Sequence, residues 1–294
     1  MNMKKTALYI TAIVLVLALF ISCSPSTGKS SLYRVSRDGV LNWVNYDLVG
    51  ETVEIPTEVN GRKITSIGYE AFCGFSKVKS VTIPEGVTKL EPRAFARCRN
   101  LESVKLPNSL TRIGANAFLE CEKLETVNLP STLKEIGQGA FGDCYRLSSV
   151  TLPDGLEALG QAAFYGCSQL SEITIPSSVK EILSSTFVYC YDLVKLTVPG
   201  NVKKIGHRAF SNCSKLQTVI IEEGVEFIDM DAFYDCEELT SVSIPSTVTS
   251  IEEDAFLFCS KLATITVASA EGKLGDPSSW GVDTTKTKVV YTGK

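Results

Sequence analysis

Cysteine recurs in this chain at a strictly fixed interval, and no other sequence feature restricts the fold as much. Eight cysteines stand 23 residues apart without one insertion or deletion: Cys98, Cys121, Cys144, Cys167, Cys190, Cys213, Cys236 and Cys259. A period of this size is typical of solenoids, in which each repeat is one structural unit stacked on the next. The spacing therefore predicts one continuous array instead of several separate globular domains.

Every unit repeats the same apolar pattern. An Ala-Phe pair follows 19 to 20 residues after each cysteine slot, with Thr186-Phe187 as its one variant, and a proline recurs in most units. About nine of the 23 positions are apolar, more than a single coil can bury, so the units must stack to hide them. In the first unit Phe75 takes the cysteine slot and Cys73 is out of register, which indicates that the slot requires an apolar side chain and not sulfur chemistry.

The spacing within a unit predicts its local structure. Val104-Lys-Leu106 alternates as a half-buried strand does, and Pro107 ends that strand because it lacks an N–H group. The segment 110–113 has either helical or second-strand spacing, and 117–124 is expected to form a short helical or 3₁₀ turn. About nine coils, each with one parallel strand about 4.8 Å from the next, make a core roughly 40 Å long.

The consensus Cys-x-x-Leu-x-x-Val-x-Leu-Pro-x-x-Leu-x-x-Ile-Gly-x-x-Ala-Phe resembles the BspA-like, or Treponema-type, leucine-rich repeats. The resemblance implies a mostly β leucine-rich-repeat solenoid over residues 53–267. Residues 32–52 resemble the hairpin that caps such arrays at the amino end, and 268–294, with Trp280, resemble the closing cap. A five-residue insertion around Val59-Asn-Gly-Arg62 lengthens the first coil. For some family members the resemblance implies adhesion to host matrix proteins or to other cells.

The amino terminus has the pattern of an export signal. Lys4 and Lys5 precede an apolar stretch of about 16 residues, whereas a membrane-spanning helix needs about 20. We expect a signal peptide over 1–22. Phe20-Ile21-Ser22-Cys23 resembles the bacterial lipoprotein cleavage box, which implies lipidation of Cys23 and a tether over 23–31. Ordinary secretion and a retained anchor are the alternatives. The expected location is the outer membrane or cell surface, with the periplasmic face as an alternative.

Composition argues against several kinds of function. The net charge is -4, and Lys and Arg are scattered instead of forming the basic face that a nucleic-acid binder presents to phosphate. The chain has a single histidine, His207, so the side chain most often used in acid–base catalysis and metal binding is scarce. We therefore expect no catalytic residues, no cofactor, no metal and no small-molecule substrate.

Four motif matches are explained by the repeat itself or by their surroundings. Gly137-Gln-Gly139-Ala-Phe-Gly142 matches a dinucleotide fingerprint, but most of it is the repeat frame. In Asp229-Met-Asp231 a ligand and the turn glycine of a calcium loop are missing. Acidic pairs such as Glu252-Glu253 fall at different phases of the coil, and His207 takes an outward position of one coil with no partner nucleophile implied.

The column of cysteines is expected to be buried and unpaired. No Cys-x-x-Cys occurs, which removes support for a structural zinc site or a dithiol redox motif. Neighbouring coils bring successive Cα atoms within disulfide range, but stacked side chains point the same way, and Phe75 in the same column favours simple burial.

Two outward columns on the predicted strands are rich in Ser and Thr, and three of the residues that depart from this composition stand in consecutive coils. These are Glu172, Lys195 and Ile220, which we take as a candidate binding site together with Thr151, Thr174 and Thr197. The alternative is that Thr is frequent in these columns only because it has a high propensity for exposed strands.

The sequence favours an exported, lipid-anchored, monomeric repeat protein that binds a protein or glycan ligand through its strand face. A structural protein of the envelope or periplasm is the second hypothesis. A hydrolase is the third, although no long insertion is present to build its pocket.

Overall fold

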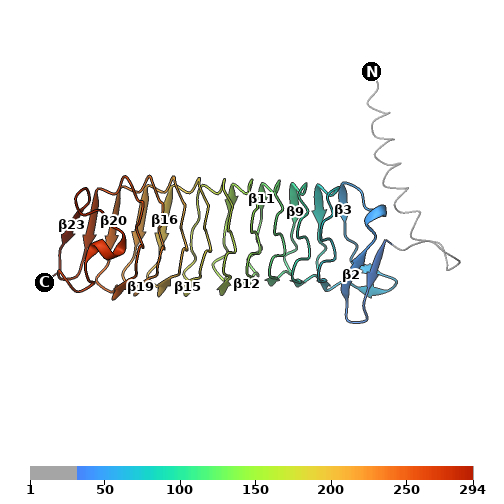
Figure 1. Cartoon of the computed structure of the whole chain (residues 1–294). Coiled ribbons are helices and arrows are strands. Elements are labelled where there is room, and N and C mark those ends of the chain that lie inside the picture. The colour runs from blue at the N-terminus through green and yellow to red at the C-terminus, as the bar shows by residue number, and fades with distance from the viewer. Residues whose placement is uncertain (1–31, 294) are drawn as a thin grey trace, which may run out of the picture. The chain divides into compact units, whose positions relative to one another are not determined.

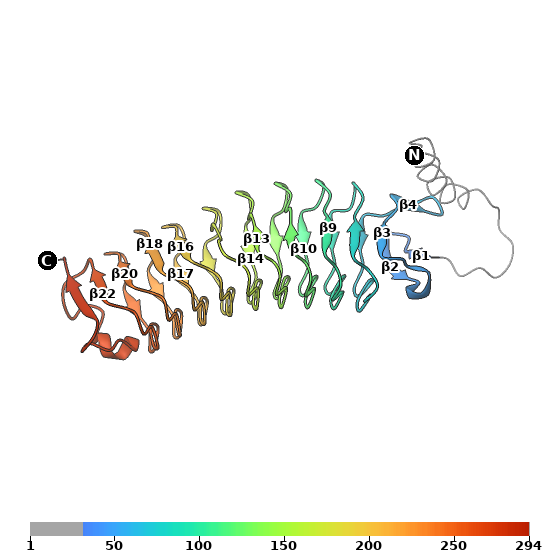
Figure 2. The same cartoon turned by 90° about the horizontal axis from the view of Figure 1, so that it is seen from above.

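The computed structural model describes residues 32–293, which form one elongated solenoid (Figures 1 and 2). The predicted signal peptide and Cys23 lie outside the described residues. Parallel strands spaced by about 23 residues build about eleven turns, counted with the turns at both ends, and helix is almost absent. The predicted leucine-rich-repeat solenoid is thus confirmed, and it has two more turns than the nine expected coils because its end segments also coil.

Most coils contribute two short strands, which line up along the solenoid in two separate parallel ladders, each made of two hydrogen-bonded sheets. The first ladder contains β3 (Thr52–Glu54), β7 (Ser80–Thr82), β9 (Ser103–Lys105), β11 (Thr126–Val127), β13 (Ser149–Val150), β16 (Lys195–Val198), β18 (Thr218–Ile221), β20 (Ser241–Ile244), β22 (Thr264–Val267) and β23 (Lys288–Tyr291). The second contains β2 (Val40–Val44), β6 (Ser66–Ile67), β8 (Lys89–Leu90), β10 (Arg112–Ile113), β12 (Glu135–Ile136), β14 (Ala158–Leu159), β15 (Glu181–Ile182), β17 (Lys204–Ile205), β19 (Phe227–Ile228) and β21 (Ser250–Ile251). The sequence allowed either helical or second-strand structure over 110–113. The structure has a strand there, β10, at the end of the segment.

The third side of each coil, which we call the turn edge, is built from consecutive turns. In one coil the N–H of Cys121 donates to the carbonyl of Phe118, while the N–H of Phe118 donates to Ala140 of the next coil at 2.8 Å. Every second N–H is thus bonded between coils. The expected helical form of 117–124 is not observed, because those N–H groups are not free to bond within the segment. The segment instead makes single turns with bonds over three residues, as a 3₁₀ turn does, such as Cys121 to Phe118 and Leu124 to Cys121.

A stack of phenylalanine rings runs through the core. Neighbouring rings of the stack lie 4.9–5.6 Å apart with interplanar angles of 13° or less. The stack comprises Phe72, Phe95, Phe118, Phe141, Phe164, Phe187, Phe210, Phe233 and Phe256, all of which are fully buried. Because the rings repeat at the spacing of the coils, this stack holds each coil in register with its neighbours.

The column cysteines lie beside this stack, buried and unpaired. Each Sγ donates to the carbonyl of the Phe 26 residues earlier, as Cys121 does to Phe95 at 3.3 Å. Burial raises the pKa of Cys98 to about 12 and that of Cys121 well above its ordinary value. Phe75 occupies the corresponding slot of the first coil, where it is buried and meets Phe72 edge to face. The column therefore serves packing, as Phe75 indicated.

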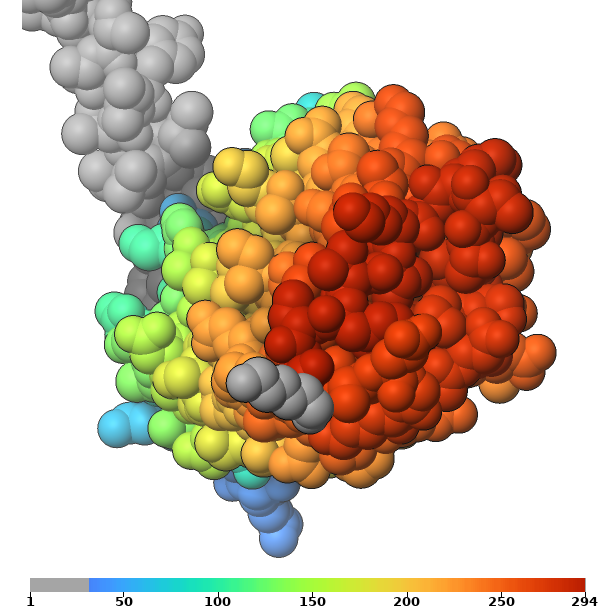
Figure 3. All heavy atoms as spheres, turned by 90° about the vertical axis from the view of Figure 1, so that its left-hand side faces the viewer, coloured from blue at the N-terminus to red at the C-terminus, as the bar shows by residue number. Residues whose placement is uncertain are grey.

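Both ends of the array are covered by segments that differ from the repeat. At the amino end β1 (Tyr33–Val35) pairs antiparallel with β2, the inserted loop forms the hairpin of β4 (Glu58–Val59) and β5 (Arg62–Lys63), and η1 (Tyr46–Leu48) precedes β3. At the carboxyl end β23 extends the first ladder, and η2 (Pro277–Trp280) places Trp280 fully inside the core. Figure 3 shows the last residues lying over this end of the stack. The apolar core is therefore shielded from water at both ends.

Glycine follows the second strand where coils approach most closely. A Cβ atom at Gly160 would lie 2.4 Å from the carbonyl carbon of Gly137 in the preceding coil, so no side chain fits there without moving the backbone. We expect Gly160→Ala to lower the free energy of unfolding by about 1–3 kcal/mol, the usual effect of overpacking. Denaturant unfolding measures this change.

Gly155→Ala is the matched control for that substitution. It lies in the same coil, and its added Cβ would meet only the flexible end of Lys134 at 3.3 Å and a carbonyl at 3.7 Å. Both variants reduce the entropy of the unfolded chain equally, so the difference between them isolates the close approach. Equal stabilities would contradict this account of the glycine.

Both ladders are interrupted at one junction, between the coil of β14 and the coil of β15. Among the described residues, no strand pairing joins Ala158–Leu159 to Glu181–Ile182, and none joins β13 to the coil of β15. At the next junction the first ladder is reduced to the single bridge of Glu172 with Lys195. Leu183 occupies the slot that Gly160 and Gly206 hold on either side. The turn edge continues across the junction, where Phe164 donates to Thr186 at 2.9 Å and Gly166 to Val188 at 2.8 Å.

Candidate binding surface

The first ladder presents its alternate side chains to solvent in rows of fixed register. Lys195 pairs with Thr218, which pairs with Ser241 and then Thr264, and the second row runs from Thr197 through Ile220 and Ser243 to Thr266. The residues between these rows, such as Leu196 and Val219, are buried. The outward side chains are therefore held on a rigid sheet, which lowers the conformational entropy lost when a partner binds.

The structure brings most of the predicted binding residues together where the first ladder resumes after its interruption, at β16. Glu172 bridges to Lys195, and Thr197 pairs with Ile220, whose side chain is 52% exposed although it is purely apolar. Thr174 is exposed in the coil of Glu172. Thr151 lies one coil earlier, beyond β13. Charge, hydroxyl and apolar surface thus meet over three neighbouring coils.

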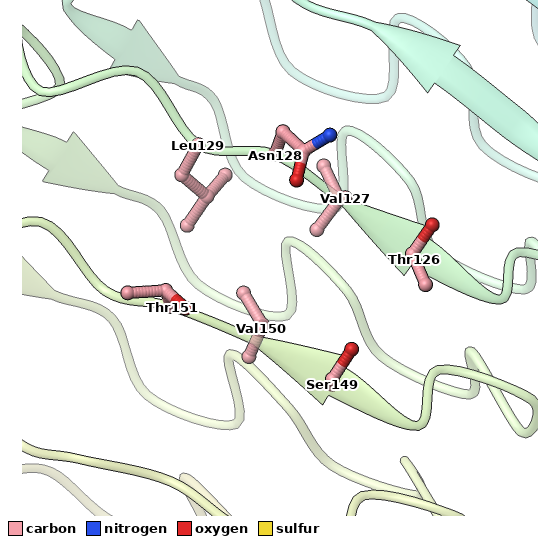
Figure 4. Close-up of a pocket in the computed structure, with 7 residues that line it drawn as sticks. All are labelled: Thr126, Val127, Asn128, Leu129, Ser149, Val150 and Thr151. Carbon is pink, nitrogen blue, oxygen red and sulfur yellow. The ribbon is translucent and has the colours of Figure 1, made fainter.

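A shallow pocket lies on the same ladder, one coil before Glu172. Its volume is about 260 Å³, and the seven residues that line it come from two neighbouring coils (Figure 4). Thr126, Asn128, Ser149 and Thr151 supply polar groups, whereas Val127 and Val150 form its floor from the core side. The predicted residue Thr151 therefore lines a hollow that can accept hydrogen bonds from a ligand.

Charged side chains elsewhere are largely neutralised by partners on the next coil. Lys203 meets Glu226 at 2.8 Å, Lys134 meets Glu157 at 3.1 Å, and Lys261 meets Glu238 at 2.6 Å. These pairs are exposed, so each contributes at most about 1 kcal/mol. Lys195 and Glu172 form no such short ion pair in the described part of the chain, and their charges are available to a partner.

Two residues of the motif matches, His207 and Asp229, each contact a residue of a neighbouring coil. His207 Nδ1 lies 3.1 Å from the carbonyl of Met230, and Asp229 is held by Lys204 at 2.7 Å. The desolvation that Asp229 experiences is outweighed by Lys204 and by the N–H of Met230, so its pKa is lowered. Over residues 32–293 no three His, Cys, Asp or Glu side chains converge as metal ligands would. No helix in that range is long and apolar enough to cross a bilayer.

From the sequence, Tyr189 or Tyr191, together with Phe227, are candidate binding anchors elsewhere on the surface, but no pocket around them is predicted. Tyr165 and Tyr189 form an edge-to-face pair, with ring centroids 5.4 Å apart, and they line a second shallow pocket. The sequence did contain a signal for these residues, namely aromatic side chains that recur at the same positions of the repeat. Tyr165 and Tyr234 share one slot of the 23-residue frame, and Tyr189 shares another with Phe258.

These features define a repeat scaffold that presents a large regular surface and no enclosed reaction site in its described part. A profile of the BspA type leucine rich repeat region matches residues 65–194 and 180–276, in six copies. The chain therefore belongs to the BspA type leucine rich repeat family. Leucine-rich-repeat solenoids are typically binding scaffolds without enzymatic activity, and a protein-binding role is general among them.

Two solved structures show what the chain is similar to. A leucine rich repeat protein of T. pallidum has 29% sequence identity and a TM-score of 0.57, and the match covers 63% of this chain and 86% of that one. A leucine-rich repeat protein from Bacteroides ovatus has 20% identity and a TM-score of 0.50, covering 91% of this chain and 100% of that one. No curated protein matches the chain significantly.

Proposed function

We infer that this protein is an exported surface protein that holds a protein partner on its first strand ladder. The observation that carries the proposal is the exposed cluster of Glu172, Lys195 and Ile220, set in a register-locked row of short hydroxyls. An exposed apolar side chain flanked by unpaired charges is the composition of a binding hot spot and its rim. The partner we propose is a matrix or cell-surface protein, held without any catalytic step.

Lipidation of Cys23 would attach the array to the membrane, with 24–31 as the tether. Ser, Thr, Gly and Lys predominate in this segment, and such a composition allows a chain to extend from an anchor. The binding sheet would then be displayed away from the membrane surface. Export and anchoring are supported by the sequence pattern of 1–23.

The test is capture of purified collagen and fibronectin by intact cells that express the chain. We expect the triple variant Glu172→Thr, Lys195→Thr and Ile220→Thr to lose at least about tenfold in affinity, since hot-spot truncations exceed 1 kcal/mol each. Cells that express a Cys23→Ser variant should capture less of either protein, because the proposed lipid anchor is lost.

A triple variant on the second ladder is the matched control. Lys180→Thr, Glu181→Thr and Phe227→Thr remove the same kinds of side chain, and all three are exposed. We expect this control to bind like the wild type. Unchanged binding by the first triple variant would reject the proposed surface, and absence of matrix-protein binding by the wild type would reject the proposed partner.

A further inference from the structure

Tyrosine side chains gather on the turn edge over the coils between residues 165 and 234, which run from yellow-green to orange in Figure 2. The rings of Tyr165 and Tyr189 lie 5.4 Å apart at an angle of 79°, and Tyr191 follows 5.8 Å from Tyr189. Tyr191 is 43% exposed. The ring faces therefore form an angled aromatic wall that is open to solvent.

The backbone at position 189 is unfavourable for a bulky residue. Tyr189 has φ of 61°, in the left-handed region. The same slot in other coils holds Asp143, Gly166, Asn212 and Asp235, and it also holds the larger residues Arg97, Glu120 and Phe258, all at positive φ. Gly, Asn and Asp tolerate this conformation, whereas a large side chain there costs about 1–3 kcal/mol. The backbone conformation therefore does not require tyrosine at this position, and the other coils show that the slot accepts side chains of many kinds.

The rings enclose a shallow pocket of about 360 Å³ whose remaining lining is mostly polar. Ser185, Asn212 and Arg208 face it together with Tyr234. The guanidinium of Arg208 is fixed because its Nε donates to Asp231 at 3.0 Å, and Asp231 is nearly buried. The pocket thus combines aromatic faces with hydrogen-bonding groups held in defined positions.

We propose that this pocket binds a carbohydrate. A pyranose ring has a face of C–H groups, which packs on an aromatic ring, and a rim of hydroxyls, which needs hydrogen-bond donors and acceptors around it. Tyr165 and Tyr189 supply the aromatic faces, while Ser185, Asn212 and Arg208 supply groups for the hydroxyls. The open shape lets further sugar units extend along the turn edge towards Tyr191.

This site is separate from the strand ladder on which the partner protein is proposed to bind. Its lining residues come from the turn edge, and none of them belongs to a strand. The inference goes beyond the proposed function and does not depend on it, so each can fail without the other.

The experiment uses the purified chain on an array of chitin, mannan and mucin-type oligosaccharides, followed by titration with the sugar retained best. Tyr189→Asn and Tyr165→Leu are the test variants. Both introduce residues that other coils already carry in these slots, Asn212 and Leu119, so the fold is preserved. We expect each to weaken sugar binding at least about tenfold, the usual size of a hot-spot loss.

Phe258→Asn is the matched control, because Phe258 shares the slot and the positive φ of Tyr189 but lies outside the pocket. It should bind sugar like the wild type, as should the triple variant of the strand ladder. Affinity for a neutral sugar should also change little between about 0.05 and 0.5 M salt. The proposal is overturned if no sugar is retained, if Tyr189→Asn binds normally, or if the tyrosine variants lose only protein capture.

Discussion

Between pH 8 and pH 10 the free energy of unfolding of this protein is expected to fall by on the order of 10 kcal/mol, enough to unfold it. Burial raises the pKa of seven column thiols above the ordinary value of 9.0, namely Cys98, Cys121, Cys144, Cys167, Cys190, Cys213 and Cys236. The unfolded chain releases these protons near pH 9 while the folded chain retains them. Stability is therefore fully present below pH 8 and is lost as the pH rises, by about 1.4 kcal/mol per unit for each thiol.

Urea unfolding at a series of pH values, with a reductant present, measures this dependence. The Cys144→Ala variant is the control, because it has one titrating thiol fewer and should show a slope shallower by about 1.4 kcal/mol per pH unit. Below pH 8 it should instead be somewhat less stable than the wild type, since burial of the sulfur is lost. The same slope in both proteins would show that the thiols are not the source of alkaline unfolding.

Phe118→Ala is expected to lower the free energy of unfolding by about 3–5 kcal/mol, the range for removing a fully buried aromatic ring. Phe118 stacks between Phe95 at 5.4 Å and Phe141 at 5.3 Å, so its removal leaves a cavity between two coils that the close inter-coil hydrogen bonds prevent from closing. Denaturant unfolding followed by circular dichroism measures the loss.

Phe227→Ala is the control for that experiment, because the side chain of Phe227 is 44% exposed on β19. It should change stability by less than about 1 kcal/mol. A similar loss in both variants would show that burial of the ring in the stack is not the cause of the effect of Phe118→Ala.

The sequence was sufficient to predict the solenoid because its strongest signal is one that only stacking satisfies. A 23-residue period with the same apolar slots in each unit leaves no other way to bury Phe118 or Cys121. Phe75 was correctly placed in the cysteine column by the period alone, although Cys73 stands two residues away. The strands and the core followed from spacing for the same reason.

The turn edge was harder to predict, because its structure depends on bonds between coils. Local spacing over 117–124 suggested a helical turn, but the N–H of Phe118 bonds to Ala140, 22 residues later. The pocket around Tyr189 was missed for a related reason. Its lining residues Tyr165, Arg208 and Tyr234 are distributed over several coils, and only the stacked geometry brings them side by side.

The interrupted junction between β14 and β15 has a mechanical consequence. When the rod is pulled from its two ends, each junction carries the same load, and the one with the fewest backbone hydrogen bonds yields first. That junction lacks the strand pairs found on either side and relies on turn-edge bonds such as that of Phe164 with Thr186. Under tension the array should therefore extend in two steps, with a force plateau for each half.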